Sequence, residues 1–236
     1  MTAALAVRRL TSGYAGSTVV NGLDFDIGSA HGVVTLLGRN GAGKTTFVHA
    51  VMGLVQPSGG SVQLDGVELA GRTPDAIARA GISLAPRGDR LFSPLTVAEH
   101  LTIAERFGRR GNWNRARVLD LLPRLGDRLG HRADQLSGGE RQMLAIAWAL
   151  LANPRLLLFD EPSDGLAPAM VAHLGTIIRS LAGQGIGILL VEQNLRLAFA
   201  VAQRVAVMEK GRIVLDTSVA DFRANPDRAR ALLGLG

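Results

Sequence analysis

The chain has 236 residues, 47% of them hydrophobic, which is enough to form one large domain with a substantial core. The sequence contains no cysteine, which excludes disulfides, thiolate metal sites and cysteine nucleophiles. The net charge of +6 suggests nucleic-acid binding, but only Lys44 and Lys210 among the 26 basic residues are lysines, so the excess indicates a general arginine bias. The longest apolar run, 143–152, is too short to span a membrane, and residues 1–14 lack a signal-peptide pattern. We therefore expect a cytoplasmic protein that binds no nucleic acid.

The first third of the chain is predicted to consist mainly of strands. Residues 5–10 read as a strand, apolar residues alternate towards the end of 19–27, and 32–38 is a continuous apolar run that ends in glycine. A helix is predicted over 43–52. The Asp65-Gly66 pair between apolar residues then marks a tight hairpin. Together these elements indicate a mostly antiparallel layer.

The rest of the chain is predicted to contain helices first and then alternating strands and helices. Residues 93–136 have a helical pattern that opens with Thr96 and Glu99 at capping-box spacing. Beyond them, strands are predicted at 156–159, 187–191 and 204–208, and helices at 169–181 and 195–201. This alternation is typical of a parallel sheet covered on both faces. We predict one α/β domain over 1–236, with a parallel-sheet core, an N-terminal antiparallel β layer and a helical subdomain inserted at about 93–136.

The stretch "GRNGAGKTT" follows a predicted buried strand and opens a predicted helix, which is the context of a phosphate-binding loop. Its residues are Gly38, Arg39, Asn40, Gly41, Ala42, Gly43, Lys44, Thr45 and Thr46. The glycines let backbone N–H groups curve around a phosphate, Lys44 adds a charge for the β- and γ-phosphates, and the Thr45 hydroxyl suits Mg²⁺. The alternative is a chance glycine turn. This is disfavoured because a chain with almost no lysine has a lysine at this position.

Two acids, Asp160 and Glu161, follow a predicted buried strand in "RLLLFDEP". They lie at the carboxyl edge of the sheet, where open α/β folds bind ligands. We expect Asp160 to coordinate Mg²⁺ and Glu161 to orient or deprotonate the water that attacks the γ-phosphate. The alternative, that both acids cap the next helix, is disfavoured by Pro162 and the apolar strand before them.

A second glycine-rich stretch, "LSGGE", starts another predicted helix. Ser137 and Glu140 have capping-box spacing, and apolar residues from Met143 onwards form one helix face. A capped helix needs neither Gly138 nor Gly139, which lower helix stability and are useful where another group must approach the backbone.

These three motifs, in this order along nearly the whole chain, resemble the ATPase subunits of ATP-binding-cassette transporters. The resemblance makes Leu136, Ser137, Gly138, Gly139 and Glu140 the signature motif, which contacts the γ-phosphate of ATP held by a partner subunit. It implies that ATP and Mg²⁺ are bound and that two cassettes form a head-to-tail dimer. It also implies that Tyr14 stacks on the adenine ring, although packing on the β layer stays an alternative.

The stretches "LSGGERQMLAIAWALL", "DEPSDGLAP" and "LLVEQN" are similar to the second ATPase subunit of branched-chain amino-acid importers and of the related urea and short-chain amide importers. The resemblance implies a second cassette subunit, identical or related, two transmembrane permease subunits and an extracytoplasmic solute-binding protein. It places the chain at the cytoplasmic face of the membrane. Branched-chain amino acids are the expected substrate, and urea or amides are the alternative.

Two positions depart from the wider cassette pattern. Gln193 stands where most cassettes have a histidine that contacts the γ-phosphate, although the resembled subfamily often has glutamine too. Arg87 stands where glutamine normally links the nucleotide to the membrane partner, and Mg²⁺ should repel this cation. By resemblance, Arg87 and Phe92 belong to the surface that couples to a permease. Two rival interpretations remain. One is a soluble cassette ATPase that acts on nucleic acid or the ribosome. The other is a nucleotide-gated module without hydrolysis, and Glu161 argues against it.

Overall fold

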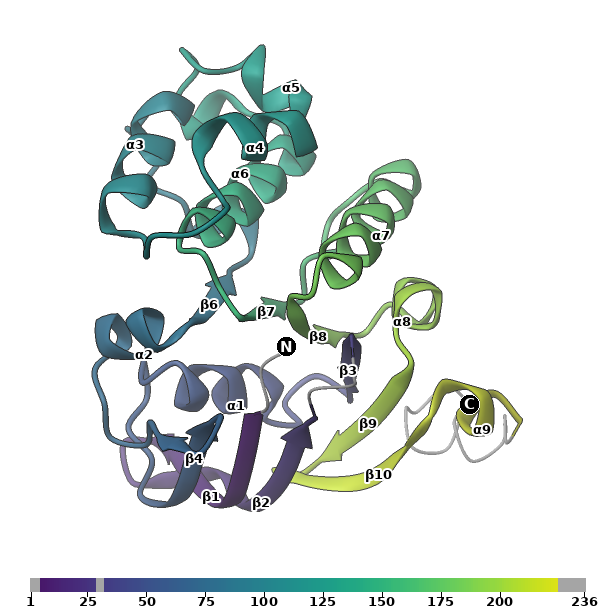
Figure 1. Ribbon diagram of the computed structural model, residues 1–236. Helices are drawn as coiled ribbons and strands as arrows, with labels where there is room; N and C mark the ends of the chain where they lie inside the picture. The colour runs from purple at the N-terminus through teal and green to yellow at the C-terminus, as the bar shows by residue number, and fades with distance from the viewer. Residues whose placement is uncertain (1–4, 29–31, 225–236) are drawn as a thin grey trace.

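The computed structural model describes residues 5–28 and 32–224, and its strands form two sheets (Figure 1). The smaller sheet is antiparallel and has the order β2-β1-β4-β5. Its strands are β1 (Leu5–Tyr14), β2 (Ser17–Ile27), β4 (Gly59–Leu64) and β5 (Val67–Glu68). Asp65 and Gly66 join β4 to β5 with φ values of 49° and 80°, as the hairpin prediction requires. The predicted antiparallel layer is therefore confirmed.

The larger sheet has six strands in the order β10-β9-β3-β8-β7-β6. They are β3 (Val33–Leu37), β6 (Ile82–Ala85), β7 (Leu156–Asp160), β8 (Gly187–Glu192), β9 (Arg204–Glu209) and β10 (Arg212–Ser218). All pairings from β9 to β6 are parallel, and β10 pairs antiparallel with β9 at the edge. The parallel core is confirmed, and the structure adds β6 and β10, which the sequence patterns did not predict. Each of β3, β7 and β8 is buried along its whole length, which explains their continuous apolar runs.

Helix α1 (Lys44–Val51) lies between the two sheets, with α2 (Pro74–Ala80) near it (Figure 1). The fully buried ring of Phe47 on α1 meets Phe25 of β2 edge to face, with ring centroids 5.7 Å apart. Residues of α1, β1, β2, β3 and β7 share one hydrophobic cluster, so this core fixes the glycine-rich loop to both sheets.

Helices α6 (Gly138–Leu151) and α7 (Pro168–Gly183) share a second hydrophobic cluster with β7 and β8. The C-terminal helices of the described chain are α8 (Leu195–Val201) and α9 (Val219–Ala224). Figure 1 shows α3 (Val97–Phe107), α4 (Arg115–Leu121) and α5 (Pro123–Gly126) grouped with α6, away from the two sheets. The short 3₁₀ turns η1 (Gly88–Arg90) and η2 (Ala133–Gln135) flank this helical group.

The predicted capping boxes form at the starts of α3 and α6. Glu99 N donates to Thr96 Oγ1 at 3.2 Å and Thr96 N donates to Glu99 Oε2 at 2.7 Å. The matching contacts of Ser137 and Glu140 cap α6. Both helices therefore begin where the sequence indicated.

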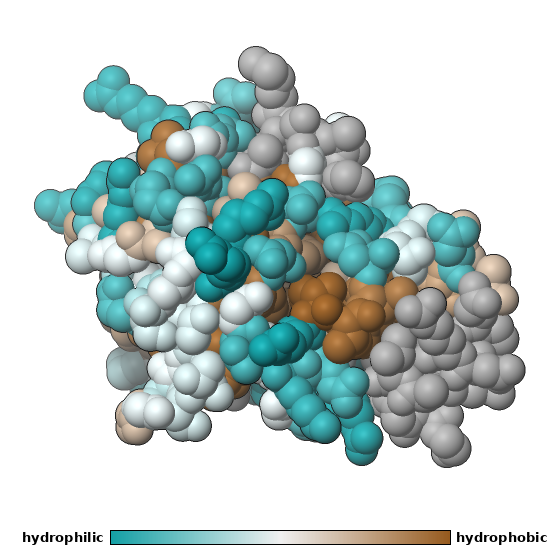
Figure 2. All heavy atoms as spheres, turned by 90° about the horizontal axis from the view of Figure 1, so that it is seen from below, coloured by the Kyte–Doolittle hydropathy of each residue, from teal (hydrophilic) through white to brown (hydrophobic). Residues whose placement is uncertain are grey.

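Seen from below the view of Figure 1, the surface is mostly hydrophilic or of intermediate hydropathy, and its largest hydrophobic area lies right of the centre (Figure 2). This agrees with the outward polar residues of β2, whose burial alternates along its second half. Among the residues that the structure describes, no helix is both long and apolar enough to cross a membrane.

Candidate functional site

The glycine-rich loop 38–46 joins the end of β3 to the start of α1, where the sequence predicts it. Gly43 precedes α1 with φ 106°, a left-handed conformation that favours glycine. A Cβ on Gly38 would lie 2.5 Å from the carbonyl oxygen of Met208, so this position has no room for a side chain. Residues 40–46 line a hollow of about 260 Å³ together with Val19, Arg87 and Glu161. Because helix N-termini bind phosphate, this hollow is the candidate nucleotide site.

Lys44 is buried in the hollow, with only 4% of its side chain exposed. Its Nζ donates to the carbonyl oxygens of Gly38 at 2.7 Å and Arg39 at 3.1 Å, and lies 3.3 Å from Glu161 Oε1. A buried ammonium group needs such partners. The lysine charge is therefore fixed beside the loop, where phosphate oxygens can reach it.

The two residues predicted to hold Mg²⁺ are in contact. Thr45 Oγ1 donates to Asp160 Oδ1 at 3.0 Å, and Asp160 is buried at the end of β7. Within the described residues, no group of three or more His, Cys, Asp or Glu side chains could hold a metal ion. Mg²⁺ commonly takes one or two protein oxygens and completes its shell with phosphate oxygens and water. One hydroxyl and one carboxylate beside a phosphate loop fit such a metal.

Glu161 directly follows β7 and has φ 50°, which is uncommon for a residue other than glycine. Its N–H donates to the Val191 carbonyl at 2.9 Å, which ties this turn to β8. Its carboxylate is 8% exposed and accepts hydrogen bonds on both oxygens: Oε1 from Gln193 Nε2 at 2.7 Å, and Oε2 from Arg87 Nη2. With Lys44 also near Oε1, the predicted base lies among three donor groups.

Gln193 follows β8, and its side-chain amide also donates to Asn40 Oδ1 at 2.6 Å. The residue before it, Glu192, was not among the sequence-predicted site residues. Its buried carboxylate accepts the backbone N–H groups of Ser163 at 3.0 Å, Gln193 at 2.9 Å and Asn194 at 3.0 Å. Burial raises the pKa of Glu192, and these hydrogen bonds oppose the rise. Glu192 thus anchors the two loops that carry Glu161 and Gln193. The sequence signal that could have identified Glu192 is an acid at the end of a buried strand.

Arg87 follows β6, the parallel neighbour of β7. Its Nη2 pairs with Glu161 and its Nη1 donates to Asp164 Oδ2 at 3.2 Å, while its buried Nε has no hydrogen-bond partner among the described residues. The sequence raised the problem of a cation beside Mg²⁺. In the structure the guanidinium contacts Glu161 and Asp164, not the Thr45–Asp160 pair that is predicted to hold Mg²⁺.

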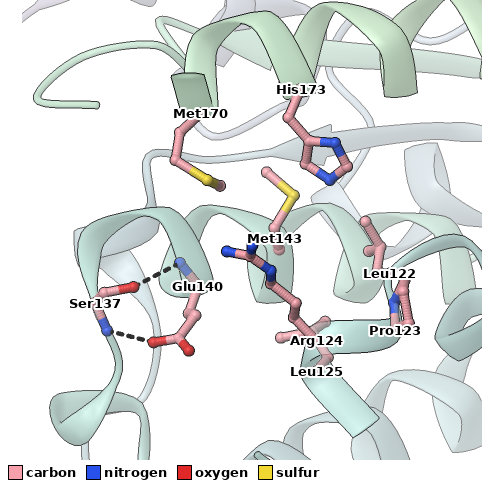
Figure 3. Close-up of a pocket in the computed structure, with 9 residues that line it drawn as sticks. All are labelled: Leu122, Pro123, Arg124, Leu125, Ser137, Glu140, Met143, Met170 and His173. Carbon is pink, nitrogen blue, oxygen red and sulfur yellow. Dashed lines mark hydrogen bonds between the residues drawn. The ribbon is translucent and has the colours of Figure 1, made fainter. Parts of the chain in front are cut away.

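The signature motif lies at the start of α6, and Figure 3 shows its capping box. Ser137 N donates to Glu140 Oε2 at 2.8 Å, and Arg128 Nε donates to Glu140 Oε1 at 2.9 Å. The N–H of Ser137, followed by Arg128, lowers the pKa of Glu140 to about 2. None of the residues 136–140 lines the hollow at the glycine-rich loop.

The two signature glycines have different surroundings. A Cβ on Gly139 would lie 2.8 Å from Met170 Cε, so the Met170 side chain of α7 covers this glycine and would have to shift to admit a larger residue. Figure 3 shows Met170 and His173 of α7 opposite Met143 of α6, around a pocket of about 140 Å³. The nearest atom to a Cβ on Gly138 would be 4.0 Å away. Only Gly138 therefore keeps open space for a group from outside.

Tyr14 ends β1 with 47% of its surface exposed, and its hydroxyl contacts His49 Nδ1 at 3.3 Å. Its ring is thus not part of a buried β-layer core, which leaves a face for a ligand. Burial lowers the pKa of His49; the charge of Asp160 opposes this shift and the nearby Arg90 adds to it. Stacking of Tyr14 on adenine stays a prediction.

Phe92 lies between η1 and α3 and is 60% exposed. Its ring centroid lies 6.1 Å from that of the buried His100 and 6.0 Å from that of Trp148. Phe92 N donates to His100 Nε2 at 3.2 Å, which holds the ring on the surface of the helical group. The structure thus presents Phe92 to solvent, away from the phosphate hollow.

Comparison with known proteins identifies the family. The sequence profile of the ABC transporter family matches residues 20–164. The high-affinity branched-chain amino acid transport ATP-binding protein BraG of Pseudomonas aeruginosa is 43% identical over 204 residues, which cover 86% of this chain and 88% of BraG. The lipopolysaccharide export system ATP-binding protein LptB of Escherichia coli is 32% identical, with 98% of each chain covered.

A solved ATP-binding subunit of an ABC transporter matches with a TM-score of 0.81 and 30% identity, over 94% of this chain and 93% of that one. The family profile spans more than half of the chain, and the glycine-rich loop, the acids after β7 and the signature helix all lie within or beside the matched segment. The chain belongs to the ABC transporter family and is one of its ATP-hydrolysing, nucleotide-binding subunits.

Proposed function

We propose that this chain binds ATP on loop 38–46, hydrolyses it with Glu161 as the general base, and thereby drives solute import through membrane partner subunits. The observation that carries the proposal is the position of Glu161. Its buried carboxylate lies 3.3 Å from Lys44 Nζ and 2.7 Å from Gln193 Nε2, in the hollow that the loop lines. A base must lie within reach of the water that it deprotonates, beside the phosphate under attack.

These positions support the following reaction. A water oxygen bonds to the γ-phosphorus, the bond from that phosphorus to the bridging oxygen breaks, and ADP leaves with the electron pair. The water proton passes to Glu161. Lys44 and the loop N–H groups stabilise the phosphate charge, and Gln193 donates a hydrogen bond to the γ-phosphate. Thr45 and Asp160 would hold Mg²⁺, which would supply further positive charge to the phosphate oxygens.

The signature motif supports a shared site. Residues 136–140 do not line the phosphate hollow, and Gly138 has open space over its backbone. We therefore assign these residues to the ATP of a partner cassette, which is a second copy of this chain or a related subunit. The two subunits would pair head to tail, with one nucleotide between each loop and the opposite signature.

The dimer can be tested by stopping hydrolysis after ATP binding. Glu161→Gln keeps the shape of the side chain and removes its basic carboxylate, so saturating Mg-ATP should shift this variant, with its partner cassette present, from monomer to dimer. Light scattering measures the mass. The matched control adds Lys44→Met to the same variant and should remain monomeric. A Glu161→Gln protein that stays monomeric in Mg-ATP contradicts the shared site.

Branched-chain amino acids are the proposed cargo, supported by the 43% identity to BraG. The 32% identity to LptB shows that relatives of this chain are also named for other cargo. We place the chain at the cytoplasmic face of the membrane, with two transmembrane permease subunits and an extracytoplasmic solute-binding protein in the same system. Affinity purification of the tagged chain from membranes, followed by mass spectrometry, should recover the permease subunits. Uptake of labelled leucine by the reconstituted system, with labelled urea as the comparison, tests the cargo.

A further inference from the structure

The ion pair between Arg87 and Glu161 places a cation directly on the proposed general base. Arg87 Nη2 pairs with Glu161 Oε2, and Nη1 reaches Asp164 Oδ2 at 3.2 Å. The Arg87 side chain is 34% exposed, whereas that of Glu161 is 8% exposed. A carboxylate in such a pair has one oxygen committed to the guanidinium and unavailable to a water molecule.

The other two groups that contact the Glu161 carboxylate, Lys44 and Gln193, differ from Arg87 in their position. Lys44 and Gln193 both lie beside the glycine-rich loop, and in the proposed function both contact phosphate oxygens. A bound triphosphate therefore competes with Glu161 for these two donors. Asp164, the second partner of Arg87, carries a negative charge that keeps the guanidinium where it is. ATP binding alone thus leaves Arg87 on the base.

The backbone around Arg87 is attached to the signature helix. Gly88 N donates to Gln142 Oε1 at 2.9 Å, and Gln142 Nε2 donates to the Pro86 carbonyl at 3.4 Å. Gln142 is 3% exposed and belongs to α6, so one buried side chain holds both neighbours of Arg87. Glu161, in contrast, is fixed to β7 and β8. Arg87 lies two residues beyond β6 of the same sheet. A shift of α6 that pulls the loop around Arg87 away from the end of β6 would separate the guanidinium from the carboxylate.

We propose that Arg87 is a positioning residue that restrains hydrolysis by holding Glu161 until α6 moves relative to β7. The proposal rests on the proposed function, in which Glu161 is the base. Arg87 then acts as a brake, meaning that it slows the chemical step of ATP hydrolysis, in the isolated subunit. The proposal also assigns release of the brake to movement of the helix that carries the signature motif.

The test is the steady-state ATPase rate of the purified full chain. Arg87→Gln should raise kcat about three- to tenfold, a modest gain because the arginine is partly exposed to solvent. The KM for ATP should not fall, because removing a cation from the hollow gives the triphosphate no new partner. Arg87→Lys keeps the positive charge and should hold kcat near the wild-type value. The matched control is Arg79→Gln, which removes an exposed arginine–carboxylate pair with Asp75 on α2 and should leave kcat unchanged.

Salt provides a readout that a purely structural role of Arg87 would not change. The pair is partly exposed, so raising the ionic strength from about 0.05 to 0.5 M should screen it and bring the wild-type kcat closer to that of Arg87→Gln. Should Arg87→Gln fold poorly by circular dichroism, Arg87→Met retains the aliphatic stem and carries the same expectations. A kcat of the folded variant at or below the wild-type value overturns the proposal and makes Arg87 an aid to catalysis.

Failure of the brake and failure of the proposed function give different results. Glu161→Gln should abolish hydrolysis both in the wild type and in the Arg87→Gln background. If it leaves hydrolysis intact in the wild type, the assignment of Glu161 as the base is wrong, whatever Arg87→Gln does. If it abolishes hydrolysis while Arg87→Gln shows no gain, only the brake is excluded.

Discussion

Replacing Glu140 with glutamine tests how the signature helix is held in place. Glutamine can still accept the hydrogen bond from Ser137 N, which is 2.8 Å from Glu140 Oε2 in the structure. The substitution therefore removes the charge and its pair with Arg128, whose Nε lies 2.9 Å from Oε1. Because Glu140 is also near the positive end of α6, the loss of a negative charge there should destabilise the fold.

The size of the effect follows from the pKa of Glu140, which is lowered from 4.5 to about 2. A shift of that size corresponds to about 3 kcal/mol at full strength. Glu140 is 20% exposed and Arg128 44%, so solvent screening reduces the charge contribution. We expect Glu140→Gln to lower the free energy of unfolding by about 1–2 kcal/mol at neutral pH. For a chain of this length, the melting temperature should fall by about 2–4 °C per kcal/mol.

The pH dependence identifies the charge as the cause. A carboxyl with a lowered folded-state pKa stabilises the protein fully above its unfolded value, and this stabilisation is lost as the pH falls from about 4.5 towards 2. Urea unfolding of wild type and Glu140→Gln should thus show a difference that narrows between pH 6 and pH 3. Glu99→Gln is the matched control, since Glu99 caps α3 in the same way and forms no ion pair with an arginine of the described segments. A difference that is equal at both pH values would refute the reasoning.

Three further substitutions address the other parts of the site. Gly43→Ala should lower the unfolding free energy by about 1–2 kcal/mol and weaken ATP binding in fluorescence titrations. It should cost more than Gly41→Ala because, although both glycines have positive φ, a Cβ on Gly43 would lie 3.0 Å from Met208 Cε, whereas one on Gly41 would meet no described atom within 4 Å. Phe92→Asp should abolish solute uptake in cells while ATP binding by the isolated subunit is retained; undiminished uptake would place the docking surface elsewhere. In a heterodimer, Ser137→Arg should lower the ATPase rate more than Glu161→Gln, because the partner's ATP uses this signature while the site of this chain is slowed by Arg87. The opposite ranking, with both variants matched for assembly, would show that the site of this chain contributes the larger share of hydrolysis.

The sequence predicted those parts of the fold whose signals are local and repeated. The buried strands β3, β7 and β8 are continuous apolar runs, and the caps of α3 and α6 are encoded within four residues. Strand β6 was missed because its four residues, with Ser83 among them, are too few for a period to be recognised. Strand β10 was missed although its burial alternates, because an edge strand has half-exposed residues and no apolar run.

The candidate site likewise contains parts that local sequence motifs predict and parts that depend on the tertiary fold. The loop 38–46 and the pairing of Thr45 with Asp160 follow from motifs in which the needed residues are adjacent or have a known context. The ion pair of Arg87 with Glu161 joins residues 74 positions apart, and only the parallel pairing of β6 with β7 brings them together. The hydrogen bonds of Gln142 to the loop around Arg87 likewise depend on where α6 packs. For Gly139 the sequence indicated a close approach, and the structure supplies it from Met170.

The charge at the carboxyl edge of the parallel sheet gives Arg87 a second effect. Asp160 and Glu192 end buried strands there, Glu161 directly follows β7, and Asp164 lies on the next turn. ATP adds its own negative charge to this group, so a lysine alone would leave the edge strongly acidic. Arg87 lines the same hollow as Lys44 and offsets part of that repulsion. The arginine that restrains Glu161 should therefore also favour ATP binding, and losing it should raise the dissociation constant for ATP together with kcat. A cation at position 87 thus moves the subunit towards an ATP-loaded, slowly hydrolysing state, in which the position of α6 decides when the chemical step proceeds.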